Sequence, residues 1–488
     1  MKSIISTVLF LLIFLFGIKV NAQKQANIWY FGDEGAGLDF NNECDPVVLT
    51  DGNMRAFEGC ACISDANTGQ LLFCTNSERV WNKNHDSIPN SYLLYGGNTI
   101  TQVMIIPKPG STTLYYIFTG DAQAGLVNVP PSGYRFHMVD MAMNNGLGGM
   151  VFKDSVLFPT PVSEKVTAIP HANGTDYWII GHSYNSNDYL SFQVSASGVH
   201  TTPVISSIGK IHDYTGSDAI GEMKPSPNGN KIAAVTLGKP DLELFDFNKA
   251  TGQLSNLITL PEAGAYNPSA GGIGSLYGLS FSPNNSFLYA SQWCSGFFNL
   301  SGKIIQYNVS SNDSATIQNS RVNVFTVPNI SFYSMKLAPD GKIYVAHHFS
   351  GPSSGYLGVI NHPNSAGLSC NYVDSAIFLN GLEGGWGLNN VMEYGLYCNK
   401  LNTAQEKESE YFFSLRPNPA QAQVDLEFHE IQNKGTVYLS DLMGNTLRSY
   451  PFSGKNLRLD LSSFSPGIYL LHGIDEQNHH FKTKLIKQ

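Results

Sequence analysis

Apolar and polar residues follow one repeated order in three segments of the chain. Each segment has an apolar strand, a proline, a turn made of Asn, Asp or Gly, and a second apolar strand. The segments are MKPSPNGNKIAAV (223–235), LSFSPNNSFLYAS (279–291) and MKLAPDGKIYVAH (335–347). Their turn residues Gly229, Asn285 and Gly341 lie 56 positions apart in both intervals. Gly and Asn supply the positive φ that short connections need, so the pattern predicts repeated β-hairpins.

Three weaker copies of this pattern lie upstream, and a further strand follows each clear copy. The weaker copies are CISDANTGQLLFCTN (62–76), MIIPKPGSTTLYYIFTG (104–120) and AIPHANGTDYWIIGHS (168–183). The further strands are DLELFDF (241–247), KIIQYNV (303–309) and YLGVIN (356–361). Six units of three or four strands, none of which can bury its own faces, stack most simply around an axis. The pattern therefore predicts a β-propeller.

The two ends of this region predict a seventh blade. The segment 381–394, GLEGGWGLNNVMEY, holds one strand, and the N-terminal residues 27–49 hold the others. We expect Ile28–Phe31 to pair with the blade that contains residues 389–392, because joining the ends of the ring removes an exposed sheet edge. The glycines at 32, 35 and 37 then form a turn, since the helix and the Lys-Ser/Thr of a phosphate loop do not follow them. Seven blades is the prediction, with six or eight as alternatives.

Composition supports an all-β chain and argues against nucleic acid as a partner. The 488 residues include 47 Gly, 24 Tyr and 28 Phe, whereas helix-forming stretches are scarce. The formal net charge is -9 and 14% of the residues are charged. No basic stripe is present of the kind that binds a phosphate backbone.

Segments outside the predicted propeller (23–398) have patterns of their own. Residues 1–22 combine Lys2, an apolar run over 8–16 and the small-residue site VNA, which predicts a cleaved signal peptide. No other apolar run is long enough to span a bilayer, so we expect no membrane span after cleavage. Residues 399–410 are polar and predict a linker. Residues 411–488 hold short alternating strands, such as VDLEF, that predict a small β-sandwich.

Two resemblances to known families follow from these segments. The hairpins PDGKIYVAH and SPNGNKIAAV resemble the YVTN-type and WD40-like propeller repeats of bacterial lactonase-like and surface proteins, although the WD dipeptide is absent. The C-terminal module resembles the type A sorting domain of type IX secretion substrates in Bacteroidota. The elements that match are RPNPA (416–420), LSDLMGN (439–445), LDLSSFSPGIYLL (459–471) and the basic residues Lys482, Lys484 and Lys487. This resemblance implies that residues 411–488 engage the type IX secretion machinery, and that the protein is secreted or held on the outer cell surface.

Seven cysteines, at positions 44, 60, 62, 74, 294, 370 and 398, sit in this exported chain. A hairpin with Thr68 in its turn would place Cys62 opposite Cys74, which predicts a cross-strand disulfide. Cys370 and Cys398 are a second candidate pair, and the odd number leaves at least one thiol free. No CxxC pair exists, so we expect no metal site built from cysteines.

The predicted hairpin turns also indicate which residues surround one mouth of the central channel. Counting back from each turn gives Glu58, Gln102, Lys165, Glu222, Tyr277, Tyr333 and Trp386. Aromatic rings beside carboxylates and amides suit a sugar or peptide ligand, and packing between blades is the alternative interpretation. Glu58 and Glu222 could act as an acid/base pair, or could hold Ca²⁺ together with Asp218.

The sequence thus predicts a secreted or surface propeller that binds a glycan or protein ligand at the channel mouth without catalysis. No nucleophile motif or metal cluster stands out, and we expect no cofactor. Two alternatives stay open: a lactonase-like or polysaccharide-degrading enzyme that uses the mouth carboxylates, and a surface component for adhesion or gliding. The sequence does not indicate an oligomeric state.

Overall fold

A computed structural model describes residues 24–42, 45–92, 101–121, 133–212, 218–261, 275–293, 301–349, 354–393, 413–428, 434–441, 446–475 and 480–488. The chain divides into two units, Met1–Lys400 and Leu401–Gln488. The predicted signal peptide (1–22) and the predicted linker (399–410) lie outside the described residues. No helix within the described ranges is long and apolar enough to cross a membrane.

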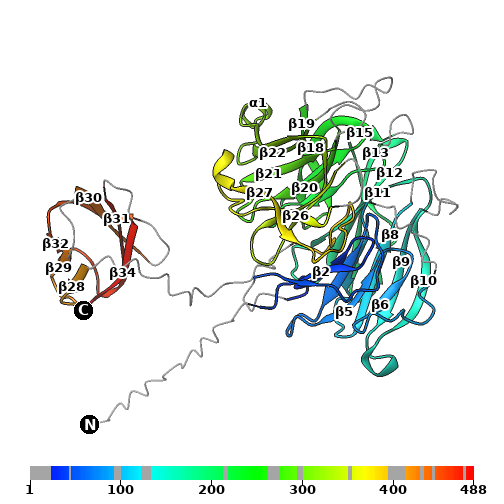
Figure 1. The fold of residues 1–488 in the computed structure, drawn as a ribbon, viewed down its shortest axis with the longest axis horizontal. Helices are drawn as coiled ribbons and strands as arrows, with labels where there is room; N and C mark the ends of the chain where they lie inside the picture. The colour runs from blue at the N-terminus through cyan, green and yellow to red at the C-terminus, as the bar shows by residue number, and fades with distance from the viewer. Residues whose placement is uncertain are drawn as a thin grey trace, which may run out of the picture. The chain divides into compact units, whose positions relative to one another are not determined.

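The three clear sequence repeats each form a four-stranded antiparallel sheet in the first unit (Figure 1). Gly229, Asn285 and Gly341 occupy the first turn of their sheets with φ of 69°, 63° and 76°, as the hairpin pattern requires. The strands of these sheets are β16 (Met223–Pro225), β17 (Lys231–Thr236), β18 (Lys239–Asn248), β19 (Gln253–Pro261), then β20 (Leu276–Phe281), β21 (Phe287–Gln292), β22 (Ser301–Asn308), β23 (Val322–Pro328), then β24 (Ile330–Leu337), β25 (Ile343–Phe349), β26 (Tyr356–Ile360) and β27 (Tyr372–Phe378).

Four more sheets precede them, so the described residues of this unit form seven sheets. Their strands are β1 (Ile28–Phe31), β2 (Ala36–Asp39), β3 (Val47–Leu49), then β4 (Ala61–Ser64), β5 (Leu71–Thr75), β6 (Val80–Asn82), then β7 (Met104–Pro107), β8 (Leu114–Thr119), β9 (Tyr134–Asp140), β10 (Gly149–Phe158), then β11 (Val162–Pro170), β12 (Tyr177–Ser183), β13 (Ser186–Ser195), β14 (Gly198–Val199) and β15 (Val204–His212). Short helical turns are η1 (Asn144–Gly146), α1 (Ser314–Asn319) and η3 (Gly367–Cys370).

The sheets follow one another around an axis. The first strands β4, β7, β11, β16, β20 and β24 contact each other in that order, and apolar side chains of neighbouring sheets share core clusters. The unit is therefore a β-propeller, and the all-β fold expected from the sequence is confirmed. The number of blades in the complete ring stays a prediction, because several segments of the unit lie outside the described residues.

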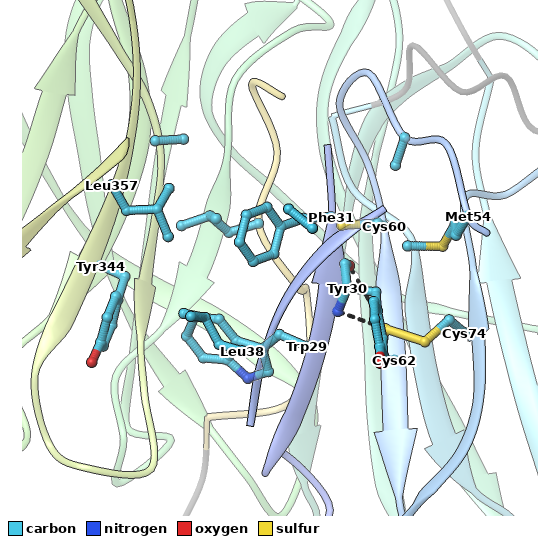
Figure 2. Packing of buried hydrophobic residues seen from close by; sticks show 14 of the residues in the cluster. Trp29, Tyr30, Phe31, Leu38, Met54, Cys60, Cys62, Cys74, Tyr344 and Leu357 are labelled. Atoms are coloured by element: carbon cyan, nitrogen blue, oxygen red, sulfur yellow. Dashed lines mark hydrogen bonds between the residues drawn. A yellow bond between two sulfur atoms is a disulfide. The ribbon is translucent and has the colours of Figure 1, made fainter. Parts of the chain in front are cut away.

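The N-terminal strands β1 and β2 fill the gap between the last sheet and the β4–β5 hairpin (Figure 2). The ring of Trp29 lies edge-on to Tyr344 of β25, with centroids 5.6 Å apart. Leu357 of β26 belongs to the same buried cluster. On the other side, the backbone N–H of Tyr30 donates to Cys62 Sγ over 3.2 Å. Apolar packing thus joins the first and last parts of the propeller.

The expected pairing of β1 with residues 389–392 does not form in the described residues, where β1 pairs with β2. The C-terminal segment instead hydrogen-bonds to the chain that enters β4: Trp386 N–H donates to the Phe57 carbonyl and Asn390 N–H to the Cys60 carbonyl, both over 2.8 Å. Glycines explain this position, because a Cβ on Gly387 would overlap the carbonyl oxygen of Glu58. Only glycine, which has no Cβ, allows the chain at position 387 to approach the backbone of Glu58 so closely.

The second unit has two antiparallel sheets that share one hydrophobic core. One sheet contains β28 (Phe413–Arg416), β29 (Gln423–Phe428) and β32 (Asn456–Asp460), and the other contains β31 (Thr446–Ser453), β30 (Lys434–Ser440), β33 (Gly467–Asp475) and β34 (His480–Lys487). Val424, Leu426 and Phe428 are buried while their neighbours in β29 are exposed, which is the alternation that the sequence predicts.

Candidate ligand-binding site

Six of the residues predicted for the channel mouth lie at equivalent places, at or just before the first strand of their sheets, whereas Trp386 lies in the segment after β27. Glu58 precedes β4, Tyr277 lies in β20 and Tyr333 lies in β24. Six of the seven predicted residues are buried, and Trp386 is half-buried. Some of these side chains contact one another, whereas others form hydrogen bonds to the backbone of neighbouring sheets.

Aromatic side chains from distant parts of the chain meet here. The rings of Tyr333 and Trp386 stack with centroids 4.5 Å apart, and Tyr277 meets Tyr333 edge-on at 5.3 Å. Phe57, which the sequence analysis did not select, packs against Trp386 at 4.6 Å. We call Phe57, Tyr277, Tyr333 and Trp386 the aromatic cluster. Trp293 is half-buried and packs against the same hydrophobic core.

Gln102 and Lys165 act as links between sheets. The side chain of Gln102 donates to the Met223 carbonyl over 3.0 Å and accepts the Met223 N–H over 2.9 Å. Lys165 Nζ donates to the three carbonyls of residues 218–220, at 2.9 to 3.3 Å. Burial lowers the pKa of Lys165 to about 7, although the nearby carboxylates of Glu164 and Asp218 raise it. Both side chains are fully buried and bond to neighbouring backbone.

Glu222 is also held by internal contacts. One carboxylate oxygen accepts the Ser334 hydroxyl over 2.6 Å, and the other accepts the backbone N–H of Leu279 over 2.8 Å. Lys224 Nζ lies 3.4 Å from the first oxygen. Glu222 therefore bridges the sheets that begin with β16, β20 and β24. Its two oxygens already have partners, which does not favour a role as the base of an acid/base pair with Glu58.

Glu58 has a different carboxylate beside it, that of Glu164. Burial and then the charge of Glu164 raise the pKa of Glu58 well above its ordinary value. The neighbouring hydroxyl of Tyr277 offsets part of this rise in the pKa of Glu58. Neither Tyr277 Oη nor Glu58 Oε2 has a hydrogen-bond partner of regular geometry among the described residues. Glu164 accepts hydrogen bonds from the backbone N–H of Thr101 over 2.9 Å and from its hydroxyl over 2.8 Å.

Sequence reasoning missed Glu164 because every residue of β11 except the last is buried, so exposed positions do not mark one face of this strand. Its pairing with β12 shifts register between Val162 and Val166, and the successive residues Ser163, Glu164 and Lys165 are all buried. A regular strand would alternate its faces, so strict period-two reasoning places Glu164 on the face opposite Lys165. A pair of charged residues inside a strand that has no other charge is the signal that could have found it.

The segment that follows Trp386 contributes buried polar side chains that contact the first strands of the sheets. Glu393 Oε1 lies 3.1 Å from Lys336 Nζ and 3.9 Å from Lys224 Nζ, and all three side chains are buried. The amide of Asn390 donates to the Val103 carbonyl over 3.0 Å and accepts from Lys224. Burial lowers the pKa of Lys336 to about 8. Residues 386–393 are thus fastened to the first strands of several sheets.

No group of three or more His, Cys, Asp or Glu side chains within the described ranges could hold a metal ion. The Ca²⁺ site considered for Glu58, Glu222 and Asp218 is therefore not assembled there. A disulfide joins Cys62 to Cys74, which are direct partners in the β4–β5 register. Cys370 is a buried free thiol, and its expected partner Cys398 lies outside the described residues.

The second unit matches a known protein family. Residues 414–488 match the model of the secretion system C-terminal sorting domain. This module is a type IX sorting domain. The chain is therefore a type IX secretion substrate with a propeller in front of its sorting domain, and it is exported to the cell surface. The sorting domain implies interaction with the type IX machinery.

Solved structures similar to the chain are distant. They include a protein of Bacteroides uniformis ATCC 8492 proposed to be a 6-phosphogluconolactonase (12% identity, 73% of this chain and 98% of that chain, TM-score 0.42). The periplasmic gluconolactonase PpgL of Pseudomonas aeruginosa (12%, 89% and 99%, 0.36) is another. PorZ, a surface component of the type IX secretion system of Porphyromonas gingivalis (11%, 95% and 74%, 0.32), is a third. A search of the curated proteins gave no match. None of these similarities assigns an activity to this chain.

Proposed function

We propose that the propeller of this secreted protein binds a glycan at the aromatic cluster and does not transform it. The observation that carries the proposal is the convergence of Phe57, Tyr333 and Trp386, from three separated segments, beside the buried carboxylate of Glu58. Rings of this kind cover the apolar faces of sugars, and a nearby polar group fixes their orientation. Protein ligands use the same chemistry and are the alternative that the test must separate.

Partial exposure of the outer members supports access by a ligand. Phe57 and Trp386 are half-buried, whereas Tyr277 and Tyr333 are 1% and 3% exposed. The buried tyrosines therefore support the accessible rings. The absence of catalysis is supported by Glu222, whose two carboxylate oxygens are engaged by Ser334 and Leu279.

The test is a glycan array and a peptide array probed with the full mature chain and with Trp386→Ala. We expect retention of one glycan class by the wild-type protein and a loss of about tenfold or more in affinity for the variant, as central aromatic contacts give. Val47→Ala, at an exposed residue of β3, is the matched control and should bind normally. Retention on peptides alone, or release of a cleaved product from the glycan, would overturn the proposal.

We also propose the processing that the sequence predicts: removal of residues 1–22 as a signal peptide, and a linker at 399–410 between the propeller (23–398) and the sorting domain (411–488). The division into two units at residue 400 supports the linker between the two domains. Mass spectrometry of the exported protein should find Gln23 as its first residue. A mature form that retains residues before Gln23 would contradict the predicted cleavage.

A further inference from the structure

We propose that the ligand is an acidic glycan, and that Arg79 and Tyr92 bind one of its uronate residues. This inference rests on the proposed function and specifies the chemistry of its ligand. The observation behind it is a guanidinium that lies against aromatic rings and has its donors free. Arg79 Cζ lies 4.4 Å from the centroid of the Tyr92 ring and 5.9 Å from that of Trp81. Among the described residues this guanidinium forms no hydrogen bond and no ion pair.

Arg79 lies on the same side of the propeller as the aromatic cluster. β4 and β5 are antiparallel, with Ala61 opposite Thr75, so the turn after β5 returns to the end of the sheet where the chain enters β4. Asn76 of this turn donates from its side chain to the Arg55 carbonyl over 2.8 Å. Arg55 is two residues before Phe57 of the aromatic cluster. A glycan bound at the cluster therefore lies on the side of the propeller that also presents Arg79.

Hydrogen bonds to the backbone set Arg79 and Tyr92 beside each other. The N–H of Arg79 donates to Asn76 Oδ1 over 3.1 Å. The next residue, Val80, donates its N–H to the Ser91 hydroxyl over 3.3 Å, and Tyr92 follows Ser91. Both side chains remain accessible, since Arg79 is half-buried and Tyr92 is 58% exposed. The pair is thus held in place and open to solvent.

A second cation reaches the same place from the neighbouring sheet. Lys153 of β10 is exposed, and its Nζ donates to the Tyr92 carbonyl over 3.0 Å. An ammonium has three donors, so this bond leaves donors for a further acceptor. Two positively charged side chains from different sheets therefore adjoin one exposed ring, although the chain as a whole has a formal net charge of -9.

A uronate matches both parts of this arrangement. A guanidinium donates two parallel N–H bonds to a planar carboxylate, and stacking on a ring leaves the N–H edge available for this contact. The exposed ring of Tyr92 offers an apolar surface to the sugar ring that carries the carboxylate. A free phosphate uses the guanidinium alone and gains nothing from the ring. A neutral sugar gains nothing from the charge of Arg79.

The experiment compares acidic tetrasaccharides with their carboxyl-reduced forms. The full mature chain is titrated calorimetrically with tetramers of galacturonate, glucuronate and mannuronate, each paired with its reduced form. One acidic tetramer should bind about tenfold more tightly than its reduced form, because hydrogen bonds between charged groups are the strong ones. Arg79→Gln should abolish this preference, and Arg79→Lys, which keeps the charge without the fork, should reduce it about threefold. Tyr92→Ala should weaken the binding of both forms.

Lys24→Gln is the control for net charge. Lys24 is exposed, and its backbone N–H bonds to Ala66 in the β4–β5 turn, at the opposite end of the same hairpin. The variant removes one positive charge, as Arg79→Gln does, and should keep the preference.

The outcomes separate this inference from the proposed function. Equal binding of the acidic and reduced forms would overturn the inference and leave glycan binding standing. Binding of no tetramer, together with retention of peptides alone on the array, would overturn both. An acidic preference that survives in Arg79→Gln would place the carboxylate elsewhere and overturn the inference, as would an undiminished preference in Arg79→Lys if Arg79→Gln does not fold. Tighter binding of hexaglutamate, lost in Arg79→Gln, would assign the site to acidic protein segments and overturn it.

Discussion

Replacing Glu393 by Gln removes one negative charge from a buried group of two lysines and two glutamates. Lys336 lies 3.1 Å and Lys224 lies 3.9 Å from Glu393, and Lys224 also pairs with Glu222 at 3.4 Å. Each of these side chains is at most 3% exposed. The wild-type group is electrically balanced, so Glu393→Gln leaves one buried positive charge without its partner.

The expected loss follows from distance and burial. Two unit charges 3.1 Å apart attract by about 5 kcal/mol at an effective dielectric constant of about 20. The cost of removing both charges from water offsets part of this attraction. Breaking a buried pair by removing one partner typically costs about 3–5 kcal/mol, because the other charge stays buried. We therefore expect the free energy of unfolding of the propeller to fall by about 3–5 kcal/mol.

The assay is urea denaturation of the full mature chain followed by tryptophan fluorescence. All five tryptophans (29, 81, 178, 293 and 386) lie in the propeller unit, so the signal reports that unit and not the sorting domain. Lys336→Met combined with Glu393→Gln restores the balance of charge. This double variant should lose at least about 1 kcal/mol less than the sum of the two single variants, since contacting residues couple. Asp86→Asn is the exposed control and should change stability by about 0.5 kcal/mol or less.

A change of less than about 0.5 kcal/mol for Glu393→Gln would refute the reasoning, because that is the effect of an exposed substitution. Additive losses in the two single variants and the double variant would also refute it. Either result would mean that the C-terminal segment is not fastened to β24 by charge.

Three other predictions test separate parts of the propeller. Replacing Cys62 and Cys74 by serine removes a disulfide that closes a loop of sequence separation 12, and should lower the free energy of unfolding by about 3 kcal/mol; an unchanged urea midpoint after reduction of the wild type would contradict this. Burial lowers the pKa of Lys165 from 10.5 to about 7, so the unfolded state binds the additional proton between these values. The contribution of Lys165 to stability should therefore be flat below pH 7 and rise above it by up to about 1.4 kcal/mol per pH unit. The difference in stability between the wild type and Lys165→Met should follow this profile, because the contribution of Lys336 is common to both proteins; a constant difference from pH 7 to 9 would exclude it. Gly387→Ala should cost about 2 kcal/mol or more, because its Cβ would overlap the carbonyl of Glu58, whereas a Cβ on Gly355 has its nearest neighbour at 3.7 Å; equal thermal midpoints for the two variants would show that the segment is free to move.

Local patterns in the sequence determined much of the fold. Gly229, Asn285 and Gly341 have the positive φ that the hairpin pattern requires, and Cys62 and Cys74 are direct partners across their hairpin. Both features depend on a few neighbouring residues, and the regularity of an antiparallel hairpin then fixes the register. The sorting domain is also contained in one continuous stretch, since its family match covers residues 414–488.

Tertiary structure alone decided how the ring ends meet and which carboxylate faces Glu58. Residues 386–390 bond to the chain before β4 and not to β1, because glycines allow a close backbone approach that strand patterns do not encode. Glu164 lies 106 positions after Glu58 in the sequence (58 to 164), on a strand that is buried on both faces. Sequence periodicity assigns a side chain to a face of its own strand. Which side chains meet at the axis depends on how seven sheets pack, and that follows from contacts between residues far apart in the chain.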